Sequence, residues 1–366
     1  MMLSRRDILS GAGALTLVSS LPAAAQTSPV FAPQPGAWRK FQVVTRIEIA
    51  ATREPVHVWL PLPEFNAPDW HRPLGSRWNS NANAIDYLAE PKYGARMLHV
   101  GWNGVADKAI LEVTSEFQTR DRATDFSTKQ AVAPLSPAER DLYLSPTDLI
   151  ATDGLVKATA DRIVAGARGD LDKARAIYEW IVDNTFRNPA TRGCGVGDIA
   201  AMLKSGDLSG KCADLNALFV GLARAAGLPA RDVYGLRVAP SKFGYKSLGA
   251  NSETVSKAQH CRAEVWLDGL GWVPADPADV RKVVLEEPPG KLALDDAKVV
   301  AARRALFGAW ETNWLAYNTA HDIALPGARG PRVPFLMYPQ AEVGGARLDS
   351  LDPDAFRYVL TAREIA

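Results

Sequence analysis

The chain of 366 residues has a formal net charge of +1, with 47% apolar and 23% charged residues. These are ordinary values for a globular protein, and the length allows two domains with a sizeable core. Because no basic field covers the chain, the composition excludes nucleic acid as an expected partner.

Residues 1–25 are predicted to be an export signal outside the fold. Residues 4–9 include the paired Arg5 and Arg6, and the apolar run at 11–21 is too short to span a bilayer. Three alanines at 23–25 offer a cleavage site. The arginines favour twin-arginine export, with a general secretory signal as the alternative. No later stretch is long and apolar enough for a transmembrane helix, so we expect a soluble, periplasmic mature protein.

An antiparallel β domain is predicted at residues 36–128, after a linker at 26–35. Three segments are rich in β-branched and aromatic residues, at 41–49, 56–60 and 109–117. Clusters of Pro, Gly and Asn separate them. This pattern is typical of a small sandwich.

The pattern becomes helical after Pro134. Asp170 is the expected N-cap of the second predicted helix. The fourth helix is the best patterned, because its apolar residues follow i, i+3, i+4, i+7 spacing and Gly227 ends it. The four predicted helices span residues 155–167, 171–186, 198–203 and 212–226.

Three strands follow the helices, and together these elements predict a second domain at residues 135–285. The strands are expected at 231–238, 261–267 and 272–275. Residues 286–366 are a C-terminal extension of unassigned role, with a helical stretch near 299–317 and a strand at 357–361. The predicted fold class is therefore α+β, with helices packed on an antiparallel sheet.

Cys212 opens the best-patterned helix and is the first candidate catalytic residue. Unpaired N–H groups and the helix dipole at this end stabilise a thiolate and lower its pKa. The same N–H groups can form one side of an oxyanion hole. Gly210 is expected to let the chain turn tightly into the helix. The alternative is that Cys212 is a small buried core residue.

His260 and Asp276 are the second and third candidates. Asp268–Gly269–Leu270–Gly271 is a turn signal, so His260 begins and Asp276 ends the two strands of a predicted hairpin. The hairpin brings them to the same end, and an odd-length loop or a bulge places them on the same face. Asp276 would then orient His260. Taken singly, His260 could be a locally satisfied histidine and Asp276 a turn residue.

The remaining cysteines are Cys194 and Cys261. A Cys194–Cys261 bridge would leave Cys212 reactive, but two buried free thiols are an equal alternative. A zinc site from the three cysteines and His260 is a weaker hypothesis, because the paired metal-ligand spacings are missing. We therefore predict no cofactor and no metal.

Two segments resemble the transglutaminase-like superfamily of papain-type thiol enzymes. They are Gly210–Arg231, with Gly-Lys-Cys at the start and Arg-Ala-Ala-Gly-Leu-Pro-Ala-Arg at the end, and His260 followed by Gly271–Pro277. The resemblance covers about residues 140–285. It implies a papain-like core in which Cys212 is the nucleophile, His260 the general base and acid, and Asp276 the orienting residue. Where an alanine often follows the histidine, this chain has Cys261, whose side chain is expected to face away from His260.

The resemblance implies an enzyme that cleaves or exchanges amide bonds through a thioester, a protease or amidase rather than a cross-linking transglutaminase. A β domain ahead of the catalytic domain is common among exported bacterial members. The expected substrate is a peptide or protein amide, with cell-wall peptides among the amides available in the periplasm. Trp180, Asn184 and Gln259 are candidates for the second oxyanion donor. The alternative function is a catalytically silent peptide-binding or assembly module.

Overall fold

The computed structural model describes residues 30–128 and 131–366. The predicted export signal at 1–25 lies outside these residues, as does part of the predicted linker. Phe31, in the remaining part, is buried, and its ring packs edge-on against Phe243 and Tyr245 at centroid distances of 5.2 and 5.0 Å. No helix within the described residues is long and apolar enough to cross a membrane.

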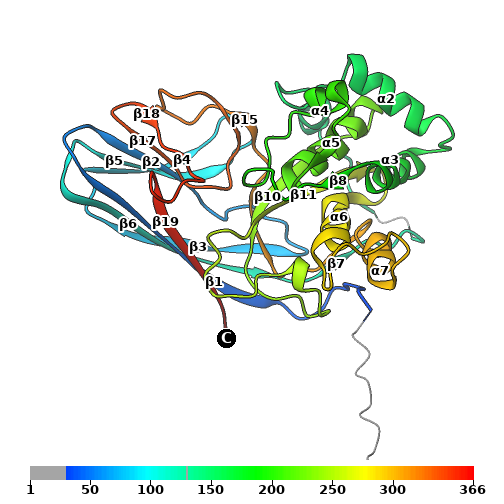
Figure 1. Ribbon diagram of the computed structural model, residues 1–366, viewed down its shortest axis with the longest axis horizontal. Coiled ribbons are helices and arrows are strands. Elements are labelled where there is room, and N and C mark those ends of the chain that lie inside the picture. The colour runs from blue at the N-terminus through cyan, green and yellow to red at the C-terminus, as the bar shows by residue number, and fades with distance from the viewer. Residues whose placement is uncertain (1–29, 129–130) are drawn as a thin grey trace, which may run out of the picture.

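A β sandwich occupies one side of the molecule, on the left in Figure 1. One sheet has the order β19-β1-β6-β3, and the other has the order β18-β17-β2-β5-β4. Burial alternates along most of β6, and the inner residues of both sheets form one apolar cluster that includes Ile47, Val58 and Val113. The strands are β1 Arg39–Thr52, β2 Val56–Pro61, β3 His71–Ser80, β4 Ala84–Ala89, β5 Arg96–Trp102, β6 Val105–Thr119, β17 Gln340–Val343, β18 Ala346–Arg347 and β19 Arg357–Ile365.

The C-terminal segment completes this sandwich. Strand β19 pairs with β1 from Lys40↔Ile365 to Glu48↔Arg357, and β17 pairs with β2. The segment predicted as an extension therefore supplies strands to both sheets of the N-terminal sandwich. The predicted helix through Tyr317 is wrong beyond Ala305, because Gly308 has a φ of 111° and the chain continues as strands.

A third sheet, with the order β12-β11-β10-β14, carries the helices on the right of Figure 1. Its last strand, β14 (Trp314–Asn318), also comes from the C-terminal segment. The other strands are β10 Ala230–Arg237, β11 Gln259–Leu267 and β12 Gly271–Ala275. The seven helices that the structure describes are α1 Pro137–Leu144, α2 Gly154–Val164, α3 Asp170–Asn184, α4 Ile199–Ser205, α5 Cys212–Ala225, α6 Pro277–Glu286 and α7 Ala297–Ala305.

Helix α5 is the centre of this α+β unit. All its residues are buried, and it packs on β10 and β11 while α2, α3 and α4 pack around it. The predicted helices are all present, but Asp170 is not an N-cap. Gly169 takes that place, and Asp170 lies in the first turn, where its carboxylate pairs with Lys173 at 2.9 Å.

Short strand pairs lie between the sandwich and the α+β unit and beside the helices. Strand β7 (Arg122–Ala123) pairs with β13 (Ala309–Trp310), and β8 (Phe186–Arg187) runs parallel to β9 (Ser209–Gly210) just before α5. The remaining elements are the 3-10 helix η1 Lys246–Leu248 and the paired strands β15 His321–Ile323 and β16 Val333–Phe335.

Candidate active site

Cys212 is the first residue of α5, as the sequence predicts, and is only 3% exposed. As the first helical residue, it has a backbone N–H with no acceptor inside the helix. The carboxylate of Asp214 accepts hydrogen bonds from the backbone N–H groups of Lys211, Val196 and Gly197, at 2.9, 3.0 and 2.9 Å. Asp214 thereby ties the loop at 193–197 to the start of the helix.

Gly210 is required for space and not for a tight turn. Its φ lies outside the left-handed region, and an added Cβ would lie 2.5 Å from the Cβ of Asp214. Gly195 is required both for its backbone conformation and for space, because its φ is 92° and an added Cβ would lie 1.9 Å from an Asp214 oxygen. The predicted role of Gly210 is therefore wrong in its cause, although the glycine does belong to the site.

The predicted hairpin places His260 and Asp276 on the same face. Strands β11 and β12 pair with Leu267 opposite Gly271, which leaves a loop of odd length between them. Nε2 of His260 lies 2.8 Å from Oδ2 of Asp276, and both side chains are buried. Since Nε2 faces the carboxylate, Nδ1 is the ring nitrogen left for Cys212.

A second carboxylate, Asp279, also faces the imidazole and is not among the residues predicted from the sequence. Its Oδ2 lies 3.4 Å from Nε2 of His260, and both of its oxygens accept from Nη2 of Arg237, at 2.6 and 2.7 Å. Despite burial, Arg237 and His260 hold the pKa of Asp279 well below its usual value. The signal for Asp279 in the sequence was its position three residues after Asp276, because the residue at this position of a helix lies close to the N-cap.

The carboxylates keep His260 protonated over a wide pH range. Burial and the charge of Arg237 lower the pKa of His260, but Asp279 and Asp276 outweigh them and raise it to about 9. Burial and the neighbouring Asp279 raise the pKa of Asp276. The site therefore favours an imidazolium held by two carboxylates.

The three thiols converge on Cys212. All three cysteines are buried and free, so the structure contains no Cys194–Cys261 bridge. The neighbouring thiols of Cys194 and Cys261, followed by His260, outweigh burial and hold the pKa of Cys212 well below its usual value. Cys261 therefore affects the pKa of the nucleophile, which the expected orientation of its side chain away from His260 does not suggest.

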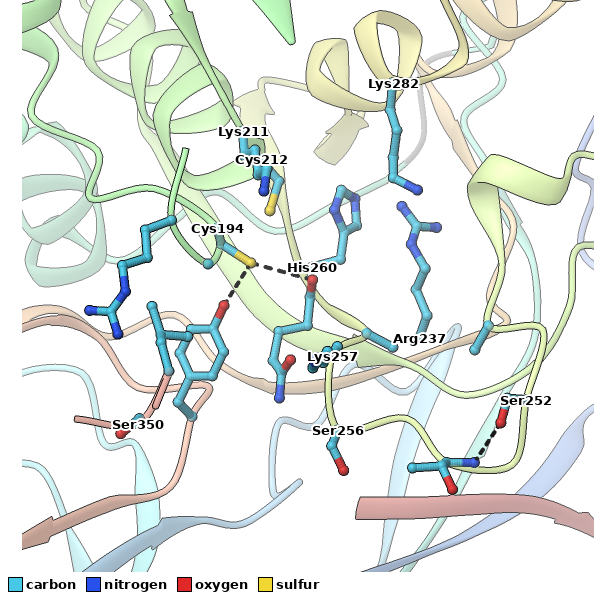
Figure 2. A pocket seen from close by; sticks show the side chains of 18 of the residues that line it. Cys194, Lys211, Cys212, Arg237, Ser252, Ser256, Lys257, His260, Lys282 and Ser350 are labelled. Carbon is cyan, nitrogen blue, oxygen red and sulfur yellow. Dashed lines mark hydrogen bonds between the residues drawn. The ribbon is translucent and has the colours of Figure 1, made fainter. Parts of the chain in front are cut away.

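Tyr338 supports Cys194 from the C-terminal segment. Its hydroxyl donates to Sγ of Cys194 at 3.0 Å, and the Cys194 thiol donates to the carbonyl of Gln259 at 3.4 Å. Figure 2 shows the sulfur atoms of Cys194 and Cys212 and the ring of His260 facing the same space.

This space is a cavity of about 730 Å³. Cys212, His260 and Gln259 line it, whereas Trp180 and Asn184 do not. Nδ2 of Asn184 instead donates to the carbonyl of Trp180 at 2.8 Å. Of the three candidate oxyanion donors, only Gln259 borders the cavity, and its Nε2 has no hydrogen-bond partner.

The site does not fit a metal ion. In the described part of the chain, the cysteine sulfur atoms and the imidazole of His260 do not form a group of mutually close ligand atoms that could hold zinc. The group whose possible ligand atoms all lie within 4.8 Å of one another consists of His260, Asp276 and Asp279. Those groups already pair with one another and with Arg237 and Arg262, the latter at 3.6 Å from Asp276. A further cation beside these arginines would be repelled.

Comparisons with known proteins agree with this architecture. Residues 157–277 match the family model of the transglutaminase-like superfamily. A Haemophilus influenzae protein, described as uncharacterized, is 38% identical over 326 residues, which cover 84% of this chain and 86% of that protein. With its α+β fold and its match to this family model, the chain belongs to the transglutaminase-like superfamily.

Two solved structures found in the comparison share little sequence with the chain. A structure described as "a Putative Cysteine Protease from Cytophaga hutchinsonii" has a TM-score of 0.49 and 16% identity, and the match covers 90% of this chain and 99% of that one. The periplasmic domain of TgpA from Pseudomonas aeruginosa has a TM-score of 0.33 and 17% identity, with 68% and 90% covered.

Proposed function

We propose that this protein is an exported thiol enzyme that cleaves or exchanges amide or peptide bonds through Cys212, His260 and Asp276. The observation that carries the proposal is the 2.8 Å contact of His260 Nε2 with Asp276, beside a cysteine at a helix N-terminus on the same cavity. This geometry supports a nucleophile, a base and an orienting carboxylate in named roles.

The proposed reaction has two stages. Sγ of Cys212 attacks the amide carbonyl, the C–N bond breaks, and imidazolium His260 gives its proton to the leaving amine. A thioester remains on Cys212. His260, now neutral, then takes a proton from water or from a second amine, which attacks the thioester and releases the thiolate.

The oxyanion of each tetrahedral intermediate needs donors. The N–H of Cys212, at the positive end of α5, is one proposed donor. Gln259 is the candidate for the second, because it borders the cavity with its amide nitrogen unpaired.

Water is the proposed acceptor, which makes the protein a protease or amidase rather than a cross-linking enzyme. The proposed location is the periplasm, reached by the twin-arginine route. The amides available there belong to periplasmic proteins and cell-wall peptides, and these are the proposed substrates.

The test is product analysis by mass spectrometry after incubating the mature protein with a diverse peptide mixture. New peptide termini should form with the native protein and be absent with Cys212→Ala and His260→Ala. Circular dichroism of each variant would establish that it is folded. Identical products from the native protein and Cys212→Ala would refute the proposal.

A further inference from the structure

We infer that the substrate carries a carboxylate close to the amide bond that Cys212 attacks, and that Lys211 and Lys257 bind this carboxylate. The inference rests on the proposed function, because it assigns a chemical class of substrate to the same cleft. It derives from the charges that border the cavity and from which of them are already paired.

The cavity wall is strongly cationic. Six arginine and lysine side chains border it, against the single carboxylate of Glu286. This excess is local, because the whole chain is almost neutral. A cleft lined by one sign of charge concentrates ligands of the opposite sign.

Several of these cations already have partners. Arg237 is held by Asp279, and Arg192 pairs with Asp349. Glu286 is shared, since both Arg187 and Lys282 contact it. One carboxylate between two cations leaves that corner of the cavity with an excess positive charge.

Lys211 and Lys257 are the two cationic residues of the cavity wall that remain. Within residues 30–128 and 131–366, neither forms an ion pair. Lys211 is half-buried and directly precedes the nucleophile, and Lys257 is exposed on the turn that leads into β11 and His260. Both border the cavity and both are labelled in Figure 2. The cavity that holds Cys212 is therefore bordered by two lysine side chains that have no ion-pair partner in the described part of the chain.

Uncharged donors on the same wall also suit a carboxylate or a peptide carbonyl. Ser252, Thr254 and Ser256 line the cavity beside Lys257. Gln259 is 8% exposed, and its Nε2 lacks a partner. Buried donors are normally paired, and the oxyanion is the acceptor proposed above for Gln259, so the hydroxyls are the uncharged donors left for the carboxylate.

Another part of the cavity wall comes from the C-terminal segment and is largely apolar. Leu351, Pro353 and Phe356 border the cavity there, together with Tyr338 and Tyr358. The cleft thus combines an apolar wall with a cationic, donor-rich wall. A peptide with an acidic group on one side of its backbone and an apolar group on the other has the matching chemistry.

The first experiment compares two alkylating reagents that differ mainly in charge, neutral iodoacetamide and anionic iodoacetate, at pH 7. The rate ratio of iodoacetate to iodoacetamide at Cys212 is measured by peptide mass spectrometry. We expect Lys211→Gln and Lys257→Gln each to lower this ratio by about two- to fivefold, the effect of one partly screened charge. Added salt should lower the ratio in the native protein.

The matched control is Lys204→Gln, which makes the same change in net charge on an exposed part of α4 away from the cavity. Its ratio should equal that of the native protein. An unchanged ratio in Lys211→Gln, Lys257→Gln and their double variant would overturn the inference. Iodoacetamide labelling that is absent or independent of His260 would instead refute the proposed function.

The second experiment identifies the carboxylate. Peptides with Glu or Asp near the cleaved bond are compared with their Gln or Asn counterparts, and free C-termini with amidated ones. The expected result is a lower KM for the acidic peptide, with the preference lost in the double lysine variant. Preference for a free C-terminus would assign the carboxylate to the chain end, and equal KM values for every pair would contradict the inference.

Discussion

Asp276 contacts His260 with one carboxylate oxygen and caps helix α6 with the other. Oδ2 contacts Nε2 of His260 at 2.8 Å, while Oδ1 accepts from the backbone N–H of Asp279 at 3.0 Å and from Nδ2 of Asn216 at 3.3 Å. The orienting residue is therefore fixed by the start of a helix, which restricts how the imidazole can turn.

Two substitutions of Asp276 should separate these roles. Asp276→Ala removes the cap and the partner of His260, so we expect about 1 kcal/mol lower stability from the lost cap and a 10²- to 10⁴-fold lower kcat. Asp276→Asn can still cap the helix, so it should retain more stability while losing the negative charge. Thermal unfolding and kcat measured on both variants check this, and equal unfolding temperatures for the two would contradict the capping role.

Asp279 should affect the pKa of His260 without being its hydrogen-bonded orienting residue. Asp279→Asn is expected to lower that pKa from about 9, because a nearby negative charge is lost. NMR titration of the imidazole measures the shift. Because Arg237 would be left buried without its partner, Arg237→Met/Asp279→Asn serves as the folded control. An unchanged His260 pKa in Asp279→Asn would contradict the role of Asp279.

The pH profile of the proposed activity should be a broad bell. Activity rises as the Cys212 thiol ionises, below the ordinary cysteine range, and falls as His260 loses its proton near pH 9. Because the folded pKa of His260 is raised, its contribution to stability is complete below about pH 6.5 and disappears as the pH passes through about 9. A profile of kcat/KM against pH tests the predicted bell-shaped activity, and an alkaline limb near pH 7 would contradict it.

Cys194 should tune the nucleophile. The neighbouring Cys194 thiol is the largest cause of the lowered Cys212 pKa, so Cys194→Ala should raise that pKa and move the acid limb of reactivity to higher pH. Cys194→Ser keeps a polar group at this position and should shift the pKa less. The measurement is the thiolate absorbance of Cys212 near 240 nm against pH, and identical titrations for the two variants would count against this role of Cys194.

Asp232, on β10, should destabilise the protein at neutral pH. It is buried, neither of its carboxylate oxygens has a hydrogen-bond partner, and burial raises its pKa to about 8. A raised carboxyl pKa favours folding only while the group is protonated, so stability is lost as pH rises from about 4 to about 8. Asp232→Asn should therefore raise the free energy of unfolding at pH 8 by about 1 kcal/mol or more. Lower stability of this variant at pH 8 would contradict the argument.

Local patterns predicted the parts of the site that lie close together in sequence. The apolar spacing of α5 was enough to place Cys212 at a helix start, and the turn at Asp268–Gly271 placed His260 and Asp276 at the same end of a hairpin. That they share a face depended on the loop length, which the structure supplies. The Arg237–Asp279 pair was not predictable in this way, because it joins β10 to α6 across 42 residues. The pairing of β19 with β1 was missed for the same reason, since side-chain alternation does not identify a distant partner strand.

The most direct test of the central claim is the pH dependence of Cys212 alkylation by iodoacetamide in the mature protein and in His260→Ala. The account predicts a thiolate that stays reactive well below the free-cysteine pKa of about 8.5 and that loses this reactivity in the variant. A rate that follows an ordinary thiol in both proteins, or no labelling of Cys212 in either, would mean that Cys212 is a core residue and would contradict the proposed mechanism.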